Sequence, residues 1–458
     1  MIGTLYTIIV VVIGLALYLL RPKWIIIYWL ILFPIVFPLY NLITLNFDRE
    51  VFYMMINQGH VGLRNLFIIL FVIEWAKNKC QIPYKGMLFI SIISIVIYIF
   101  FHNLIHHPGQ FELWPVFSQL LSMILPLFFF ILRRDLLPTI TMLHCLIITI
   151  LVLQILGIAV DLTGNHVYPT FYVPYIAVLE NGTMYDDSLR EGLAMGTFPS
   201  STILSNFLTT IYLFYSLEYF SGKNVSTKLY VSMTLIIAVM LLLSGIRVGL
   251  ALFMFIIIAC NVMYIHTHVK LFLFTLILSI SGYLSLISYD VSSGSDEGNE
   301  GLNRQLEGMA MFVQSKKTGD EDFSTFRLTP YLLENYFMEG PFIGNGASYK
   351  GEYAYGNSGS VTLQMFQADA RLAYMVVEYG MIGIFLYFLY YNSIFKYLKS
   401  QVIKDERKKL SLCFLYFIIL TVVDPGLFDR LNFPLIYIYA LCVLQPLNQS
   451  FDLIGIEK

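Results

Sequence analysis

Apolar runs of roughly 15 to 23 residues recur along the chain, and short polar segments separate most of them. A helical run of this length spans the hydrocarbon core of a bilayer, which is about 30 Å thick. We place about thirteen such spans, within a range of about twelve to fourteen because boundaries are the least certain part of such a prediction. They lie at 2–20, 24–45, 62–76, 86–101, 112–132, 138–160, 199–220, 230–245, 248–265, 270–288, 371–391, 410–425 and 432–447. The pattern predicts an all-α polytopic membrane protein with a single integral-membrane domain over residues 1–458.

Lysine and arginine in the short connections give the orientation. The basic segments fall in alternate connections, so placing them all in the cytoplasm satisfies the positive-inside rule without a violation. They are 21–23, 77–85, 133–135, 221–228, 266–270 and 396–409. The N-terminus is then expected outside and the C-terminus inside. The first apolar run has no basic residues before it and is followed directly by Arg-Pro-Lys, so we interpret it as a retained helix.

Two connections on the outer side are much longer than the others. Residues 161–198 and 289–370 are polar and rich in Gly, Asn, Asp and Ser. Long loops in a compact architecture are usually lids or binding segments. The larger loop also contains two segments that we expect to be surface helices, GLNRQLEGMAMFVQ and TPYLLENYFMEG.

Composition agrees with a membrane protein and excludes other classes. The chain has 58% hydrophobic and 13% charged residues, about half the charged fraction of a typical soluble domain. The formal net charge of −2 and the lack of a basic stripe with interleaved aromatics argue against a nucleic-acid partner. The five cysteines contain no CxxC pair, so neither a disulfide framework nor a zinc site is indicated.

The two kinds of basic residue are distributed unequally between the sides. In this topology 13 of 17 cytoplasmic basic residues are lysine, whereas 8 of 11 outer ones are arginine. Arginine has a planar fork that holds phosphate or carboxylate by two hydrogen bonds. The skew indicates an outer face that binds anions, although chance in a small sample and snorkelling at helix ends would produce a similar pattern.

Arg247 stands in the segment SGIRVGL, 244–250, in the outer turn between two apolar runs. A charge at this level needs a partner or a polar cavity. Two interpretations remain open. The guanidinium either reaches lipid phosphates from a tight turn or belongs to an anion-binding site fixed on rigid helix ends.

SGIRVGL resembles the S-x-R-x-G turn of the Wzy-type O-antigen polymerases and their relatives, the O-antigen ligases. Three further segments are similar to that superfamily in the same order: LREGLAMGTFPSSTILSNFL (189–208), FRLTPYLLENYFMEGPFIGNGASY (326–349) and DARLAYMVVEYGMIGIFLYF (369–388). The resemblance implies a GT-C-like membrane fold and no metal or other cofactor. It covers most of the chain from 189 to 390.

The resemblance to polymerases is closer than that to ligases. Ligases carry a His-Asn pair nine residues before the glutamate, where this chain has Asp369 and Ala370. The implied reaction transfers a growing polysaccharide from undecaprenyl pyrophosphate to the sugar of a new undecaprenyl-pyrophosphate-linked oligosaccharide. The implied location is the bacterial inner membrane, among membrane lipids, with the active site on the periplasmic face. A chain-length regulator and a repeat-unit flippase are the implied protein partners.

Arginines placed where negative charge grows on the leaving pyrophosphate would stabilise the transition state more than the ground state. We expect Arg190 and Arg247 to be catalytic in this sense and Arg327 to bind substrate. Arg371 is a further, less favoured candidate for substrate binding. The alternatives are structural. Arg190 could pair with a neighbouring aspartate on the surface, and Arg327 could be a charge at the start of an amphipathic helix.

The acceptor hydroxyl needs a base or an orienting carboxylate. Asp369 lies where the large loop re-enters the membrane, and its alternative role is an ordinary helix N-cap. Glu378 lies nine residues on, about 13 Å further along an ideal helix. It would bind substrate or hold one of the arginines.

Histidines 102, 106 and 107 are close enough in sequence to suggest a metal site, but no cysteine or carboxylate joins them, so interfacial histidines are the alternative. Two other functions compete with a polymerase. A ligase would share the fold and use a lipid A core acceptor. A transporter or flippase for lipid-linked oligosaccharides would show two related halves and charged residues at the midplane, and neither feature is present in the sequence.

Overall fold

The computed structural model describes residues 2–31, 49–77, 86–106, 125–126, 128–130, 132–162, 177–178, 184–185, 194, 196–198, 201–221, 225–244, 247–264, 342–344, 371–400 and 407–423. Its helices are α1 (Ile2–Leu20), α2 (Trp24–Ile31), α4 (Arg49–Lys77), α5 (Met87–His106), the 3₁₀ turn η2 (Arg134–Leu136), α7 (Ile140–Asp161), α8 (Ser201–Phe220), α9 (Thr227–Ser244), α10 (Arg247–Met263), α16 (Arg371–Ser400) and α17 (Arg407–Val423). The two short strands β1 (Ala177–Val178) and β2 (Met184–Tyr185) pair antiparallel.

The all-helical class predicted from the sequence is confirmed for the described part, apart from this two-residue ladder within the 161–198 loop. Ten of the predicted spans coincide with helices or, as with 24–45, begin one, within a few residues at most ends. The exceptions are α4, which begins at residue 49, and α16, which continues to Ser400. Both extensions mix charged and polar residues with apolar ones, so a search for continuous apolar runs does not register them. The predicted spans 270–288 and 432–447 and the two expected surface helices lie outside the described residues.

Several helices are apolar. Of the described helices, α7 and α9 are long and apolar enough to cross a membrane, with mean hydropathies of 2.6 and 1.9. Three shorter apolar helices cover Thr4–Leu20, Phe89–His102 and Val248–Met263. By length and composition alone, these helices resemble both membrane spans and the core helices of a soluble protein.

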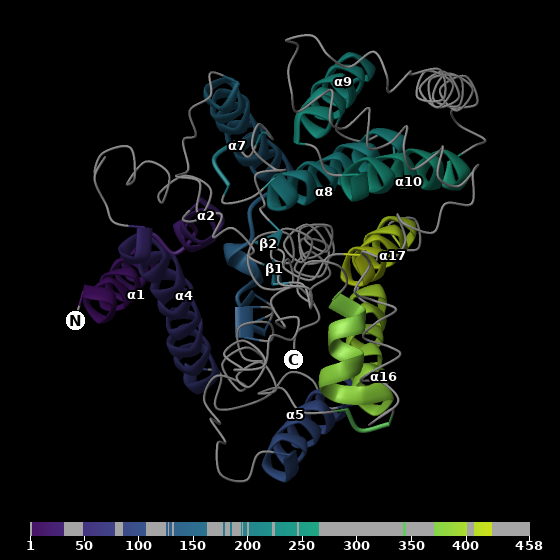
Figure 1. Ribbon diagram of the computed structural model, residues 1–458. Helices are drawn as coiled ribbons and strands as arrows, with labels where there is room; N and C mark the ends of the chain where they lie inside the picture. Colours follow the sequence, from purple (N-terminus) through teal and green to yellow (C-terminus); the bar gives the residue numbers. More distant parts are fainter. Residues whose placement is uncertain are drawn as a thin grey trace, which may run out of the picture.

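Helix α8 is the centre of the packing. Every described side chain from residue 204 to 220 is buried, and Figure 1 shows α8 beside α10. The two helices run in the same direction, because Tyr212 contacts Phe253 and, two turns later, Phe220 contacts Tyr264. A helix that is covered on all sides can hold polar residues, provided that neighbouring helices satisfy them.

Three other helices pack antiparallel to α8. Helix α9 follows it in a hairpin closed by stacked rings of Tyr219 and Tyr230. On α7, His144 lies near Tyr215, whereas Gln154, ten residues on, contacts the residues before α8 begins. On α17, Tyr416 contacts Thr209 and Thr210, while the start of the helix contacts the end of α8.

Helices α1 and α4 form a second, parallel pair (Figure 1). A Cβ added to Gly14 would lie 2.2 Å from Leu66, and one added to Gly62 would lie 2.9 Å from Val10. Small residues on facing surfaces let two helix backbones approach closely. The constant offset of 52 residues between these contacts shows that the helices run in the same direction.

The helix directions define two ends of the molecule. Helix α16 is antiparallel to α17, since Tyr391 contacts Phe417 and Phe395 contacts Phe414. We call one end the basic end; its described residues are 18–23, 74–77, 133–136, 218–221, 225–228, 396–400 and 407–409. We call the other the motif end; its described residues are 98–102, 154–161, 194, 196–198, 201–205, 243–244, 247–249, 342–344 and 379–383. Spans predicted to alternate in direction do so in every helix pair described above.

Candidate functional site

The structure gives the backbone of three of the predicted site residues. Arg247 is the first residue of α10, Arg371 is the first residue of α16, and Glu378 lies within α16. The side chains of these three lie outside the described parts, as do Arg190, Arg327 and Asp369 entirely. The convergence of these guanidinium and carboxylate groups therefore stays a prediction, and the geometry around them comes from their neighbours.

The segment that leads into α8 is bound to the end of α7. The Gly196 amide donates to Asp161 at 2.7 Å. Gln154 accepts from the Thr197 amide at 2.9 Å and donates to the Thr197 hydroxyl at 2.5 Å. Gly196 has a φ of +62°, a conformation that favours glycine. A Cβ on Gly157 would lie 2.6 Å from the Gly196 backbone, so only a glycine permits this approach.

The same segment contacts the segment SGIRVGL. The Ala194 amide donates to the Leu243 carbonyl at 3.0 Å, at the end of α9. On the other side of the turn, a Cβ on Gly249 would lie 1.7 Å from the Ser205 hydroxyl of α8. Two of the four segments that resemble the polymerase superfamily, 189–208 and 244–250, are thus packed together. Arg247 begins its helix between these two contacts.

The other two similar segments also contact each other. The Ile382 amide of α16 donates to the Phe342 carbonyl at 3.1 Å. Helix α16 is kinked at Gly380, where φ is +62°. A Cβ at Gly380 would lie 2.4 Å from the Phe342 oxygen and 2.6 Å from the Gly344 nitrogen. Glycine at this position therefore allows both the kink and the close approach of residues 342–344.

Helix α5 completes this second contact. The Tyr98 hydroxyl lies 3.0 Å from the Ile343 carbonyl and 2.6 Å from the Tyr379 carbonyl, and donates to both. The ring of His102 stacks on Tyr98 with centroids 5.3 Å apart and lies 6.2 Å from the ring of Tyr379. His102 is buried among aromatic rings at the motif end and is not a residue of an open surface loop.

The metal hypothesis for the histidines stays untested as a set. The side chain of His106 and all of His107 lie outside the described residues. Across the part of the chain that the structure describes, no three His, Cys, Asp or Glu side chains gather in a way that could hold a metal ion.

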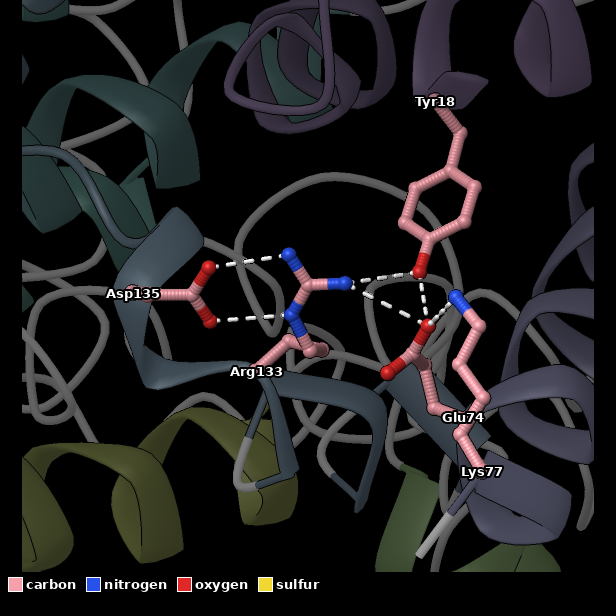
Figure 2. Close-up of polar contacts among 5 residues, drawn as sticks. All are labelled: Tyr18, Glu74, Lys77, Arg133 and Asp135. Carbon is pink, nitrogen blue, oxygen red and sulfur yellow. Dashed lines mark hydrogen bonds and ion pairs between the residues drawn. The ribbon is translucent and has the colours of Figure 1, made fainter.

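The basic end contains a different kind of polar group, which Figure 2 shows. The Glu74 carboxylate is almost fully buried and accepts hydrogen bonds from Lys77 at 2.7 Å and from the Tyr18 hydroxyl. Arg133 lies 3.3 Å from Glu74 and donates to Tyr18 at 2.8 Å. Its fork also holds Asp135 by two bonds of 2.9 and 2.8 Å.

Because these groups satisfy one another, we interpret the cluster as a structural tie. The hydrogen bonds that Arg133 donates to Asp135 lower the pKa of Asp135 and raise that of Arg133, so both stay charged. The guanidinium has its fork occupied by a carboxylate, which leaves little of it to bind an external anion. The tie joins α1, α4 and the turn η2 at one level.

A second tie lies at the basic end, between α8 and α17. Lys409 donates to Glu218 at 2.9 Å, and the two side chains are only 2% and 0% exposed. Burying two charges is costly unless they pair, and here they do. The pair fixes the end of the central helix to the start of α17.

Sequence reasoning missed the residues that hold the motif end, Gln154, Asp161 and Tyr98, and the buried carboxylates Glu74 and Glu218. A signal was available for three of them: Gln154, Glu74 and Glu218 are isolated polar residues within apolar runs. Such residues are by default structural or functional contacts. Tyr98 gave no signal, since tyrosine is common in apolar helices at membrane interfaces.

In comparisons with known proteins, no protein-family model matches the chain, and no curated protein matches it either.

Proposed function

We propose that this chain is a polytopic membrane glycosyltransferase that polymerises lipid-linked oligosaccharide repeat units. It would transfer the growing chain as a block from undecaprenyl pyrophosphate to a newly arrived repeat unit, on the outer face of the bacterial inner membrane. It would have about thirteen spans in a GT-C-like arrangement and build O-antigen or a related surface polysaccharide.

The observation that carries this proposal is the pairwise packing of the four similar segments at the motif end. The 189–208 segment contacts SGIRVGL through Ser205 and Gly249. The 326–349 segment contacts the 369–388 segment through Phe342 and Ile382. Each contact joins segments that are far apart in sequence, and both pairs lie at the same end of the helices, which supports the proposal of a shared site there. The described parts of the basic segments, among them 21–23, 133–135, 225–228 and 396–400, lie at the opposite end, which agrees with a cytoplasmic position for them.

Exposed apolar side chains support placement in a membrane. Leu235 and Val239 on α9 are 58% and 55% exposed, and Phe385 and Phe388 on α16 are 58% and 51% exposed. Extended apolar surfaces of this kind are unusual on soluble monomers. Surrounding lipid would cover them without a loss of solubility.

The proposed chemistry divides the roles among the residues. The bond between the anomeric carbon of the growing chain and the pyrophosphate oxygen breaks, and the acceptor hydroxyl oxygen forms the new glycosidic bond. Asp369 takes the hydroxyl proton, and Arg190 and Arg247 stabilise the charge on the departing pyrophosphate. Arg327 and Arg371 hold the lipid pyrophosphate, and Glu378 orients the acceptor sugar.

The test is chain extension by the purified protein in vesicles that contain a lipid-linked repeat unit. We expect the wild type to produce a ladder of products and Arg190→Ala, Arg247→Ala and Asp369→Ala each to abolish it at normal protein levels. Arg247→Lys should be partly active at best, because lysine has no bidentate fork. A ladder from all three alanine variants would contradict the site, and transfer to purified lipid A core without a ladder would identify a ligase.

A further inference from the structure

Tyr98 on α5 joins two parts of the chain that are far apart in sequence. Its hydroxyl donates to the carbonyl oxygens of Ile343 and Tyr379, which belong to the large-loop segment and to α16. Both acceptors are backbone groups, so the contact does not depend on the side chains at those two positions. The ring is held in place by stacking on His102.

The contact lies directly beside a break in α16. In a continuous α-helix the Ile382 amide would donate to the carbonyl four residues earlier, which is that of Glu378. Here it donates to the Phe342 carbonyl, and Gly380 has a φ of +62°. Kinks and local breaks of this kind concentrate at functional sites, where they redirect a side chain.

The direction of the helix turn that contains Glu378 therefore depends on the docked segment 342–344. That segment is held at Gly380 by close packing against its backbone and at Ile343 by Tyr98. The kink and the docking support each other, because the Phe342 carbonyl receives the amide that the kink releases. Loosening the segment would allow α16 to change the direction of the turn before Gly380.

We propose that Tyr98 is a positioning residue for acceptor binding. By holding residues 342–344 against the kink of α16, its hydroxyl fixes the direction of Glu378 and thereby of the acceptor sugar. This inference rests on the proposed polymerase function. It adds a residue from α5, a helix outside the four segments that resemble the superfamily.

The first test is Tyr98→Phe, which removes the hydroxyl and keeps the ring that stacks on His102. Preformed lipid-linked chain serves as saturating donor, and the KM for the repeat-unit acceptor is measured. We expect this KM to rise about tenfold with kcat nearly unchanged, the result of losing one hydrogen bond that orients a bound substrate. Loss of folded protein would lower the maximal rate and leave KM unchanged, so the two explanations are separable.

Tyr390→Phe is the matched control. Tyr390 is a buried tyrosine of α16 whose hydroxyl has no hydrogen-bond partner among the described residues. The same chemical change, made on the helix that contains the kink, should leave both KM and kcat as they are in the wild type.

The second readout is independent of activity: hydrogen exchange of a peptide covering 379–385, which contains the Ile382 amide. We expect Tyr98→Phe to accelerate exchange there and Tyr390→Phe to leave it unchanged. Unchanged exchange in Tyr98→Phe would show that Tyr98 does not hold residues 342–344 against α16. Faster exchange with an unchanged KM would overturn the positioning role. If the wild type extends no chains at all, the proposed function and the positioning role fail together. The exchange difference still measures whether the Tyr98 hydroxyl holds residues 342–344 against α16.

Discussion

The two ends of the molecule are held together by different kinds of contact. At the basic end, charged side chains bind other side chains, as in the pairs Lys409–Glu218 and Arg133–Glu74. At the motif end, most of the described polar contacts run from a side chain to the backbone, as from Tyr98 to the Ile343 carbonyl and from the Thr197 amide to Gln154.

The difference indicates two purposes. An ion pair between helix side chains fixes helix against helix and depends on the identity of both residues. A contact with a loop backbone fixes the path of the loop and leaves its side chains free. Phe342 and Ile343, in the docked segment, are accordingly 69% and 50% exposed. The motif end can thus hold the backbone of its loops firmly while their side chains stay exposed.

The largest effect is expected from breaking the buried ion pair Lys409–Glu218 at the basic end. Lys409→Met leaves the Glu218 carboxylate buried without its cation, which should destabilise the protein by about 3–5 kcal/mol. Thermal unfolding in detergent measures the loss. The double variant with Glu218→Leu should recover most of it, and Lys399→Met, which changes an exposed lysine, should change little. Equal stability of Lys409→Met and the wild type would show that the pair does not hold the two helices.

The next largest effect is expected from breaking the close packing of residues 342–344 against Gly380 at the motif end. Gly380→Ala places a side chain at a φ of +62° and a Cβ 2.4 Å from the Phe342 oxygen. We expect a loss of about 2–3 kcal/mol in unfolding free energy and release of residues 342–344. Gly86→Ala separates the backbone strain of a positive φ from the steric clash of the added Cβ. Gly86 also has a positive φ, but no atom lies within 4 Å of an added Cβ. If the two variants lose equal stability, the docked segment contributes nothing.

A smaller effect tests whether the backbone contacts serve activity more than stability. Gln154→Leu leaves the Thr197 amide without its acceptor, at a cost of about 1–3 kcal/mol. Chain extension should fall by more than the loss of folded protein explains, because this segment leads from Arg190 to α8. Asp161→Asn is the control, since its remaining carbonyl oxygen still accepts from Gly196. Activity and folded fraction falling in proportion would assign Gln154 to stability alone.

The smallest effect concerns the exposed part of the basic end. Asp135 is largely exposed, so Asp135→Asn should lower stability by less than about 1 kcal/mol. Arg133 lowers the pKa of Asp135, so the stabilisation is complete above the unfolded pKa of about 3.9 and is lost as the pH falls through the lower folded value. Unfolding temperatures of the variant and the wild type should therefore differ by a constant amount between about pH 5 and 8. A difference that vanishes within that window would exclude this ion pair as its cause.

The sequence predicted the helices well and the contacts between them poorly. Runs such as 2–20 and 138–160 are long and apolar, and hydropathy alone locates them. Gly249 is the glycine of the S-x-R-x-G turn and Gly380 lies in the 369–388 segment, and both are points of close approach. The hydrogen-bond partners of Tyr98 and Asp161 are backbone groups of distant residues. No pattern in the amino-acid order encodes such a pairing, because every residue offers the same carbonyl and amide.

The buried pair at the end of α8 has a consequence for synthesis. Glu218 leaves the ribosome 191 residues before Lys409, a delay of roughly 10 to 40 seconds at ordinary translation rates. During that time the carboxylate has no lysine to neutralise it and must stay hydrated or bind a proton. The packing of this central helix is therefore complete only when translation reaches α17, and a chain truncated before residue 409 should be degraded.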